Sequence, residues 1–401
     1  MKHELFAAAE SLADWMTGIR RDLHQHPELG FEERRTSDRV RRELAAMGVE
    51  LRPCSVETAV VGLIRGVGDG PVTGLRADMD ALPVMEQTGL PYASTVPGVM
   101  HACGHDGHTA ALLGAARLLA ERRDRFRGAV LLLFQPAEEG VRGARAMIEA
   151  GALRDPAPDA VFALHGWPML PLGRIGWRVG PAMAAADRFH CEVRGRGAHA
   201  AHPHKASDPI HAAAQAVVAL QQIVSRRVDP IQPAVLSVCT FQGGTTTNVI
   251  PDTAAFSGTV RTLDDGVRQS VERGMQEVLD GVGRSTGCEF KLDYRRSCPP
   301  LVNDPAMTEL ILRTAGELLG PEAAVELPPS MGAEDFSRMI EAAGGRGALF
   351  RLGLQRPGEP PMGGLHNSRF DFSDEALPAG AAVLARLALL RQEPPATGGY
   401  R

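Results

Sequence analysis

Two short segments of the sequence carry side chains that are typical of a metal centre with its own base. Cys103 and His105 are separated by one glycine, so two transition-metal ligands of different softness can leave one tight turn in the same direction. Further along the chain, Glu138 and Glu139 are adjacent. Hydrolysis at a metal needs a carboxylate that is free to take a proton from water, as well as ligands for the ion. Glu139 can complete the metal shell while Glu138 stays free as the base.

The elements expected around these side chains place them where strands of a sheet end. The glutamate pair follows the near-continuous apolar run 129–134, which predicts a buried strand. Further strands are predicted at 58–64, 71–76 and 159–165, with helices at 105–120 and 143–150. The alternation indicates an α/β layer, whose chemistry lies at strand ends. His165 ends one such strand. Taken alone, His165 or His366 would more commonly be a core histidine bonded to a backbone carbonyl.

A different order of elements follows residue 181. Strands are predicted at 189–193, 234–241, 254–262 and 288–294, and helices at 208–226 and 264–287. This βαββαβ order is ferredoxin-like. A helix at 305–319, a strand at 347–352 and a helix at 374–390 then follow. A chain of 401 residues exceeds the usual size of one core. We therefore expect one domain at 1–183 and 297–401, with residues 184–296 inserted into it.

Composition limits the classes of partner. The chain is 44% hydrophobic and 23% charged, as is usual for a globular protein, and its net charge of -5 gives no electrostatic footprint for nucleic acid. It contains no apolar run long enough to span a bilayer, and its opening residues do not resemble a secretory signal. The six cysteines are scattered and form no Cys-x-x-Cys pair. We expect a cytoplasmic protein that binds neither nucleic acid nor membrane.

Several motifs, in the order in which they occur, make the chain resemble the co-catalytic dinuclear metallopeptidase family of aminoacylases and glutamate carboxypeptidases. The resemblance is to its amidohydrolase branch, which comprises hippurate hydrolases, N-acyl-L-amino acid amidohydrolases and auxin-amino acid conjugate hydrolases. The motifs lie at 21–33, 76–83, 101–108, 135–139, 197–204, 248–252 and 332–336. The resemblance covers nearly the whole chain. It implies a mixed-sheet, zinc-peptidase-like α/β catalytic domain with an inserted ferredoxin-like α+β domain for dimerisation or as a lid.

The resemblance also implies the contents of the metal centre. The implied ligands are Cys103, His105, Glu139, His165 and His366, with Glu138 as general base. Two divalent ions are expected about 3.5–4 Å apart, and Zn, Mn, Co or Ni would suit these ligands. Asp78 stands where other family members have a metal-binding histidine. Asp80 is then expected to orient a ligand, although it could be an ordinary turn aspartate.

In the inserted domain, the resemblance implies residues that contact the substrate. His199 would reach the active site of the other subunit and donate a hydrogen bond to the oxyanion. Asn248 and Arg261 would hold the α-carboxylate of the substrate. These roles imply a homodimer, or a higher oligomer. From the residues alone, His199 could equally be an ordinary surface histidine and Arg261 a charged residue at a strand edge.

The predicted function is metal-dependent hydrolysis of an N-acyl amino acid, with a hippurate-like, N-acetyl or aryl-acyl group, to a carboxylic acid and a free amino acid. The alternatives within this class are an N-acetyl- or N-succinyl-diaminopimelate deacylase and a related dipeptidase or carboxypeptidase. A thiol nucleophile at Cys103 with His105 as its base is disfavoured, because one intervening glycine places them poorly for that hydrogen bond. An inactive metal-binding scaffold is disfavoured because Glu138 is present.

Overall fold

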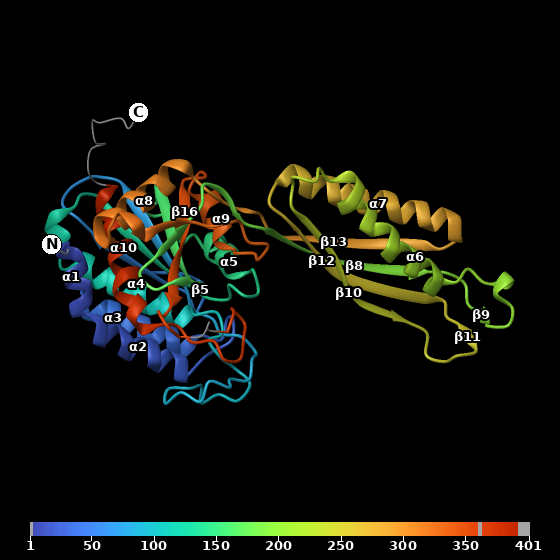
Figure 1. Ribbon diagram of the computed structural model, residues 1–401, viewed down its shortest axis with the longest axis horizontal. Coiled ribbons are helices and arrows are strands. Elements are labelled where there is room, and N and C mark those ends of the chain that lie inside the picture. The colour runs from blue at the N-terminus through green and yellow to red at the C-terminus, as the bar shows by residue number, and fades with distance from the viewer. Residues whose placement is uncertain (1–2, 360–362, 392–401) are drawn as a thin grey trace. The chain divides into compact units, whose positions relative to one another are not determined.

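The computed structural model describes residues 3–359 and 363–391, which fall into two compact units (Figure 1). The first unit comprises Met1–Gly180, Val302–Pro328 and Arg338–Arg401, and the second comprises Pro181–Leu301 and Pro329–Ser337. The short strands β7 (Gly180–Met183) and β14 (Leu301–Asn303) include positions at which the chain passes from one unit to the other.

The first unit is built on an eight-stranded mixed sheet in the order β1-β2-β4-β3-β5-β16-β6-β15. Its strands are β1 (Glu50–Arg52), β2 (Val60–Arg65), β3 (Val72–Asp78), β4 (Ala129–Gln135), β5 (Ala160–Pro171), β6 (Ile175–Trp177), β15 (Ala324–Glu326) and β16 (Gly347–Gln355). Strands β4, β3, β5 and β16 are parallel to their neighbours in this series. Their carboxyl ends therefore meet at one edge of the sheet, where ligands usually bind in such folds.

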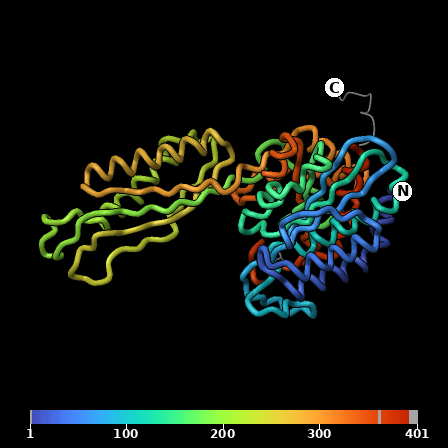
Figure 2. Tube along the Cα trace, turned by 180° about the vertical axis from the view of Figure 1, so that it is seen from behind, coloured from blue at the N-terminus to red at the C-terminus, as the bar shows by residue number. Residues whose placement is uncertain are grey.

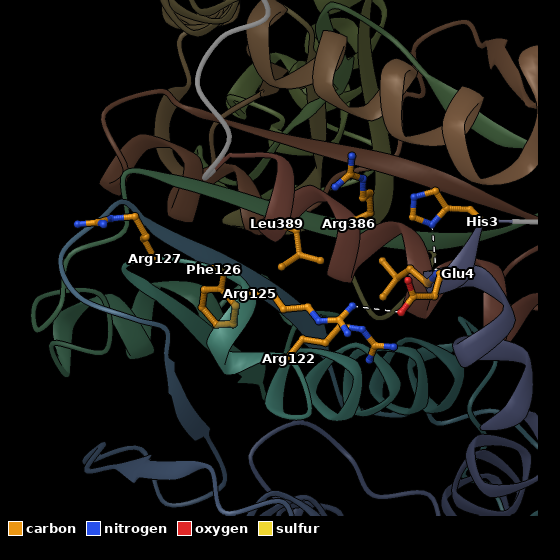
Figure 3. A pocket seen from close by; sticks show the side chains of 9 residues that line it. His3, Glu4, Arg122, Arg125, Phe126, Arg127, Arg386 and Leu389 are labelled. Atoms are coloured by element: carbon orange, nitrogen blue, oxygen red, sulfur yellow. Dashed lines mark hydrogen bonds and ion pairs between the residues drawn. The ribbon is translucent and has the colours of Figure 1, made fainter.

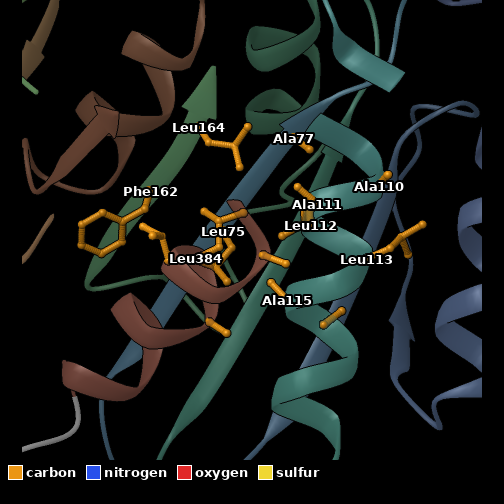
Figure 4. Packing of buried hydrophobic residues seen from close by; sticks show 14 of the residues in the cluster. Leu75, Ala77, Ala110, Ala111, Leu112, Leu113, Ala115, Phe162, Leu164 and Leu384 are labelled. Carbon is orange, nitrogen blue, oxygen red and sulfur yellow. The ribbon is translucent and has the colours of Figure 1, made fainter. Parts of the chain in front are cut away.

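Helices cover this sheet and complete the core. They are α1 (Glu4–Ser11), α2 (Ala13–Gln25), α3 (Arg34–Ala46), α4 (His105–Ala120), α5 (Gly143–Glu149), α8 (Pro305–Leu319), α10 (Leu377–Leu390) and the part of α9 (Phe336–Ala342) from Arg338 onward. Helix α4 is buried almost all round, as expected of a helix without a polar face. Its alanines let it pack closely against Leu75 of β3, Phe162 of β5 and Leu384 of α10 (Figure 4). Among the described residues, no helix is long and apolar enough to cross a membrane.

The second unit contains a four-stranded antiparallel sheet in the order β10-β12-β8-β13. Its elements are β8 (Ala185–Arg194), α6 (Pro209–Gln222), β10 (Ala234–Gly243), β12 (Thr253–Thr262), α7 (Asp265–Thr286) and β13 (Glu289–Cys298). Both helices lie on one face of the sheet, as Figures 1 and 2 show from opposite sides. Phe189, Val193 and Phe256 pack under them in a separate core. The chain order and strand order confirm the predicted ferredoxin-like fold.

Strand β12 runs the length of this small sheet. Thr253 pairs with Arg194 at one end and Arg261 pairs with Ala186 at the other. The two residues of β12 are eight positions apart, which corresponds to about 26 Å at about 3.3 Å per residue. A short pair, β9 (Ala198–His199) with β11 (Val249–Ile250), belongs to the chain segments that continue from the Thr253 and Arg194 end.

Candidate metal centre

The first unit brings the predicted ligands together from segments far apart in the sequence. Cys103 immediately precedes the turn into α4, His105 begins that helix, Glu139 follows β4, and His165 lies in β5. The ligand atoms of Cys103, His105 and His165 all lie within 4.8 Å of one another. The same holds for those of Cys103, Glu139 and His366. Cys103 therefore belongs to both groups.

Gly104 makes the turn between Cys103 and His105 possible. It adopts a left-handed conformation with φ of 85°, which L side chains rarely tolerate. A Cβ atom at this position would also lie 3.0 Å from the ring of Phe372. Glycine thus allows the chain to present Cys103 and then to start α4 with His105 within the same group.

His366 approaches Cys103 from another loop. Its backbone N–H donates to the carbonyl oxygen of Ala102 at 2.8 Å, and its own φ of 65° is left-handed. A non-glycine residue in this conformation is typical of functional sites, where the surrounding contacts must hold it. Contacts with Cys103 and then Glu139 raise the pKa of the His366 side chain to about 10.

His165 presents a free nitrogen lone pair to Cys103. Its Nδ1 donates to the carbonyl oxygen of Gly166 at 2.8 Å, because a carbonyl can only accept. Nε2 therefore carries the lone pair, and it lies 3.6 Å from the sulfur of Cys103. Burial lowers the pKa of His165 well below its usual value. The lone pair on Nε2 is what a histidine must offer to a metal ion. Strand β5 continues past His165 to Pro171, instead of ending there as predicted, because β16 pairs alongside it.

Buried polar atoms of His105 and Glu139 indicate where a cation fits. Neither ring nitrogen of His105 has a well-aligned hydrogen bond among the described residues, and the same is true of Oε1 of Glu139. That oxygen lies 4.0 Å from His105 Nε2 and 3.3 Å from His366 Nε2. Buried polar atoms are nearly always satisfied in native proteins. A divalent ion would satisfy these atoms, and their N, O and S chemistry suits borderline transition metals. The residues therefore fit a metal centre.

Asp80 contacts both glutamates and His105, one of the predicted ligands. Its Oδ1 accepts from the backbone N–H of Glu138 and its Oδ2 from that of Glu139, both at 3.0 Å. Oδ1 also lies 3.3 Å from Nδ1 of His105. Asp80 therefore fixes the turn that carries Glu138 and Glu139. Nε2 of His105 is left to face Oδ2 of Asp78 at 3.6 Å and Oε1 of Glu139 at 4.0 Å.

Glu138 lies beside the ligands on a constrained turn. Its side chain is buried, and a carboxylate oxygen lies within 4.8 Å of ligand atoms of His105 and Glu139. The preceding Ala137 has a left-handed φ of 53° and donates its backbone N–H to Oε1 of Glu33 at 2.8 Å. Contacts from Asp80 and Glu33 thus hold the turn on both sides, and Glu138 is near enough to the ligands to act on a molecule bound there.

The role of His108 was not predicted from the sequence. Nε2 of His108 accepts from the backbone N–H of Gly166 at 2.7 Å. Nδ1 must therefore carry the proton, and it donates to Oδ1 of Asp78 at 2.6 Å. Both nitrogens are occupied, so His108 is a poor metal ligand even though it lies close to Asp78 and His105. It instead ties the end of β3 to the residue after His165. The three-residue spacing from His105, which places both rings on one helix face, was the available sequence signal.

A buried charge network holds the start of α4 from the other side. Asp106 accepts from Nδ1 of His24 at 2.8 Å and lies 3.1 Å from Nε of Arg20. Burial lowers the pKa of His24, but the Asp106 carboxylate outweighs this effect and the pKa rises to about 9. The motif at 21–33 thus contributes a support for the helix that begins with His105.

The predicted substrate-binding residues belong to the second unit and not to the metal groups. His199 and Asn248 are exposed, and the backbone N–H of Ala200 donates to the carbonyl oxygen of Asn248 at 3.0 Å. Nδ1 of His199 accepts from the N–H of Ala201 at 3.0 Å, so Nε2 carries the proton and can donate. Arg261 is half-buried near the other end of β12. The structure thus places His199 near Asn248, and Arg261 apart from both.

Comparison with known proteins identifies the family. Residues 74–390 match the family described as Peptidase family M20/M25/M40. The chain belongs to this family. The resemblance noted from the motifs is confirmed, and so is the zinc-peptidase-like fold with an inserted domain. As a member of the M20 family, the chain is a hydrolase that acts on amide bonds.

Two relatives and one solved structure are similar over most of their lengths. An N-acetyl-L-cysteine deacetylase of Bacillus subtilis (strain 168) is 46% identical over 340 residues, covering 85% of this chain and 81% of the relative. The IAA-amino acid hydrolase ILR1-like 4 of Arabidopsis thaliana is 41% identical over 379 residues, covering 94% and 85%. The Bacillus subtilis YXEP protein, described as a dinuclear metal binding peptidase from the M20 family, superposes with a TM-score of 0.83 at 37% identity, covering 96% and 99%.

Proposed function

We propose that the protein is a metal-dependent amidohydrolase that cleaves N-acyl amino acids into a carboxylic acid and a free amino acid. The observation that carries this proposal is the convergence of Cys103, His105, Glu139, His165 and His366 beside the buried Glu138. The names of the two relatives support the substrate class, because each describes an amino acid that carries an acyl group on nitrogen.

We further propose that the centre holds two divalent ions of Zn, Mn, Co or Ni. The two ligand groups that share Cys103 support this number, as does the dinuclear description of the Bacillus subtilis structure. His105 and His165 would belong to one ion, and Glu139 and His366 to the other. When bound, such ions supply polarisation of the scissile carbonyl and acidification of water.

Glu138 would move the proton in the reaction. As a carboxylate it can take a proton from the attacking water. It can then deliver that proton to the amide nitrogen, which must be protonated before the amino acid leaves. Its position on the turn held by Asp80 supports this role, because the N–H bond to Asp80 fixes the backbone while the side chain lies beside the ligands.

We assign His199, Asn248 and Arg261 to substrate contacts that two subunits share. Nε2–H of His199 would donate to the oxygen of the scissile carbonyl as charge develops on it. Asn248 and Arg261 would bind the α-carboxylate. Within one chain, the segment that carries Asn248 and the position of Arg261 are separated by most of β12, a distance much longer than an N-acyl amino acid. One site can use both only if they come from different chains, and this supports a homodimer.

The test is Glu138→Gln compared with Glu139→Ala. Glu138→Gln should lower kcat by about 10²–10⁴-fold, since it removes a general base, while metal content measured by elemental analysis stays at the wild-type level. Glu139→Ala should lose metal and activity together. Near-normal turnover in Glu138→Gln would sink the proposal.

A substrate panel tests the class of acyl compound. Purified enzyme, reconstituted with each metal in turn, is assayed on N-acetyl, benzoyl and indoleacetyl amino acids, on a dipeptide and on N-succinyl-diaminopimelate. Preference for the N-acyl amino acids supports the proposal. If kcat/KM for the dipeptide or the diaminopimelate derivative is higher by at least about tenfold, or about 1.4 kcal/mol, the proposal is wrong and the corresponding alternative takes its place.

A further inference from the structure

An arginine-rich cavity lies in the first unit, formed by the start of α1, the segment after α4 and the end of α10 (Figure 3). Its volume is about 300 Å³, which is at the lower end of the range for small-molecule sites. Arg122, Arg125, Arg127 and Arg386 line it together with one carboxylate, Glu4. We call it the arginine pocket. The proposed reaction does not use any of these residues.

The charges around the arginine pocket leave a positive excess. Arg125 pairs with Glu4 at 3.1 Å, and Arg386 pairs with Glu317 at 2.9 Å. Arg127 donates to a backbone carbonyl, that of Asp69, at 2.9 Å, and a carbonyl does not neutralise its charge.

Arg122 likewise donates to a backbone carbonyl, that of Leu118, at 3.0 Å. It also lies 3.8 Å from the carboxylate of Glu121, which Arg117 shares at 3.4 Å. Guanidinium groups suit carboxylate and phosphate because their N–H groups form a planar fork.

The other part of the lining is apolar. Leu5 and Phe126 are each 4% exposed, and the half-buried Leu389 completes the surface. A cationic rim over an apolar floor fits a ligand with one anionic group and an apolar body, since each part meets matching surface. Bare inorganic ions would use only the rim.

We propose that the arginine pocket binds a small organic anion, with its carboxylate or phosphate at Arg122 and Arg125 and its apolar body against Leu5 and Leu389. Arg125 can serve an incoming anion although it pairs with Glu4, because both side chains of that pair are exposed and such pairs are weak. In Figure 3, Arg122 and Arg125 lie on one side of Leu389 and Arg386 on the other, whereas Arg127 extends away from them.

This site is distinct from the metal centre, although the same elements lead to both. Helix α4 begins with His105 and ends at Ala120, two positions before Arg122. Its 16 residues span about 24 Å at about 1.5 Å per residue. Strand β4 likewise begins two positions after Arg127 and ends at Gln135, three positions before Glu138. The metal centre and the arginine pocket therefore lie at opposite ends of α4 and β4.

Calorimetric titration of the metal-loaded enzyme tests the proposal. The probes are benzoate and phenyl phosphate, with inorganic phosphate and the neutral benzamide for comparison. The variant is the double substitution Arg122→Gln and Arg125→Gln. The matched control is Arg123→Gln, which removes a neighbouring charge that does not line the pocket and instead bonds to the carbonyls of Met47 and Gly48. Wild type and control should show a binding event that is at least about tenfold weaker in the double variant, since charged hydrogen bonds are lost.

The probes can also bind at the metal centre. That binding should persist in the double variant, which should keep wild-type turnover, and this distinguishes it from binding in the arginine pocket. The stronger of the benzoate and phenyl phosphate events identifies the anionic group. Identical binding isotherms for wild type and double variant would overturn the proposal. It would also be overturned if benzamide gave the same event as benzoate, or if inorganic phosphate bound there as tightly as phenyl phosphate.

Discussion

At the residue scale, hydrogen bonds determine which histidine atoms are available to a metal. His108 uses both ring nitrogens, on Asp78 and on the N–H of Gly166, and so holds β3 and β5 around His165, one of the proposed ligands. His108→Ala should therefore weaken metal binding by about 10–100-fold, as loss of partners behind ligands usually does. Competition with a metal-sensitive dye measures this affinity. His202→Ala, which removes an exposed histidine, is the control. Unchanged affinity in His108→Ala would show that the ligands hold their positions without it.

Glu33 gives a residue-scale prediction about pH. Burial raises the pKa of this carboxyl from 4.5 to about 7. The folded protein therefore binds more protons than the unfolded chain between these values, and the free energy of unfolding should fall as pH rises from 4.5 to about 7. Glu33→Gln keeps an acceptor for the N–H of Ala137 but cannot ionise, so this fall should be smaller. Urea unfolding across this range measures it, with the exposed Glu32→Gln as control. Equal pH profiles for wild type and Glu33→Gln would contradict the argument.

At the element scale, the turn between β4 and α5 depends on how closely the helix approaches it. A Cβ atom on Gly143 would lie 1.6 Å from the carbonyl oxygen of Pro136, so Gly143→Ala must displace the backbone that leads to Glu138 and Glu139. We expect a loss of kcat of about tenfold or more, since misplacement by about 1 Å can cost a hundredfold. Steady-state kinetics and metal content measure the effect.

A glycine with open space around it provides the control for this variant. Gly316 lies in α8, and a Cβ atom added there would meet no atom within 4 Å beyond the adjoining backbone of its own helix. Gly316→Ala should keep wild-type activity and stabilise the protein by about 0.5–1 kcal/mol. A Gly143→Ala enzyme as active as Gly316→Ala would mean that the turn absorbs the added methyl group without moving the glutamates.

The elements also show what could be predicted from the sequence. Helix α4 was predicted at its observed bounds, because its run of small and aliphatic residues is a local signal. Cys103, His105 and Glu139 could be proposed because they lie in contiguous motifs, whereas His165 and His366 were implied only by the family resemblance. The hydrogen bond from the N–H of Gly166 to His108 could not be predicted, because it joins residues 58 positions apart and depends on how α4 packs against β5. The arginine pocket could not be predicted either, because α1 and α10 meet there only in the folded chain.

At the scale of the whole molecule, mixed dimers test which residues act across the interface. A Glu138→Gln chain combined with a His199→Ala chain would form one site with both groups intact, if His199 acts on the other subunit. Activity should then recover toward that of one wild-type site per dimer. The matched pair is His199→Ala with Asn248→Ala, in which each site lacks one group and no recovery is expected. Verified heterodimers of the first pair that stay inactive would show that His199 does not act in trans. The two chains carry different tags, so that heterodimers can be purified away from both homodimers before their activity is assayed.

The length of β12 carries a consequence for the enzyme at low concentration. If the residues near its two ends serve different active sites, an isolated chain has ligands and base but lacks part of its substrate contacts. Dilution then removes activity by mass action even when every chain remains folded and metal-bound. Specific activity should fall steeply below the concentration at which the subunits dissociate. Adding folded chains with an inactive metal centre should restore it, because their second unit can complete the substrate contacts of an active chain.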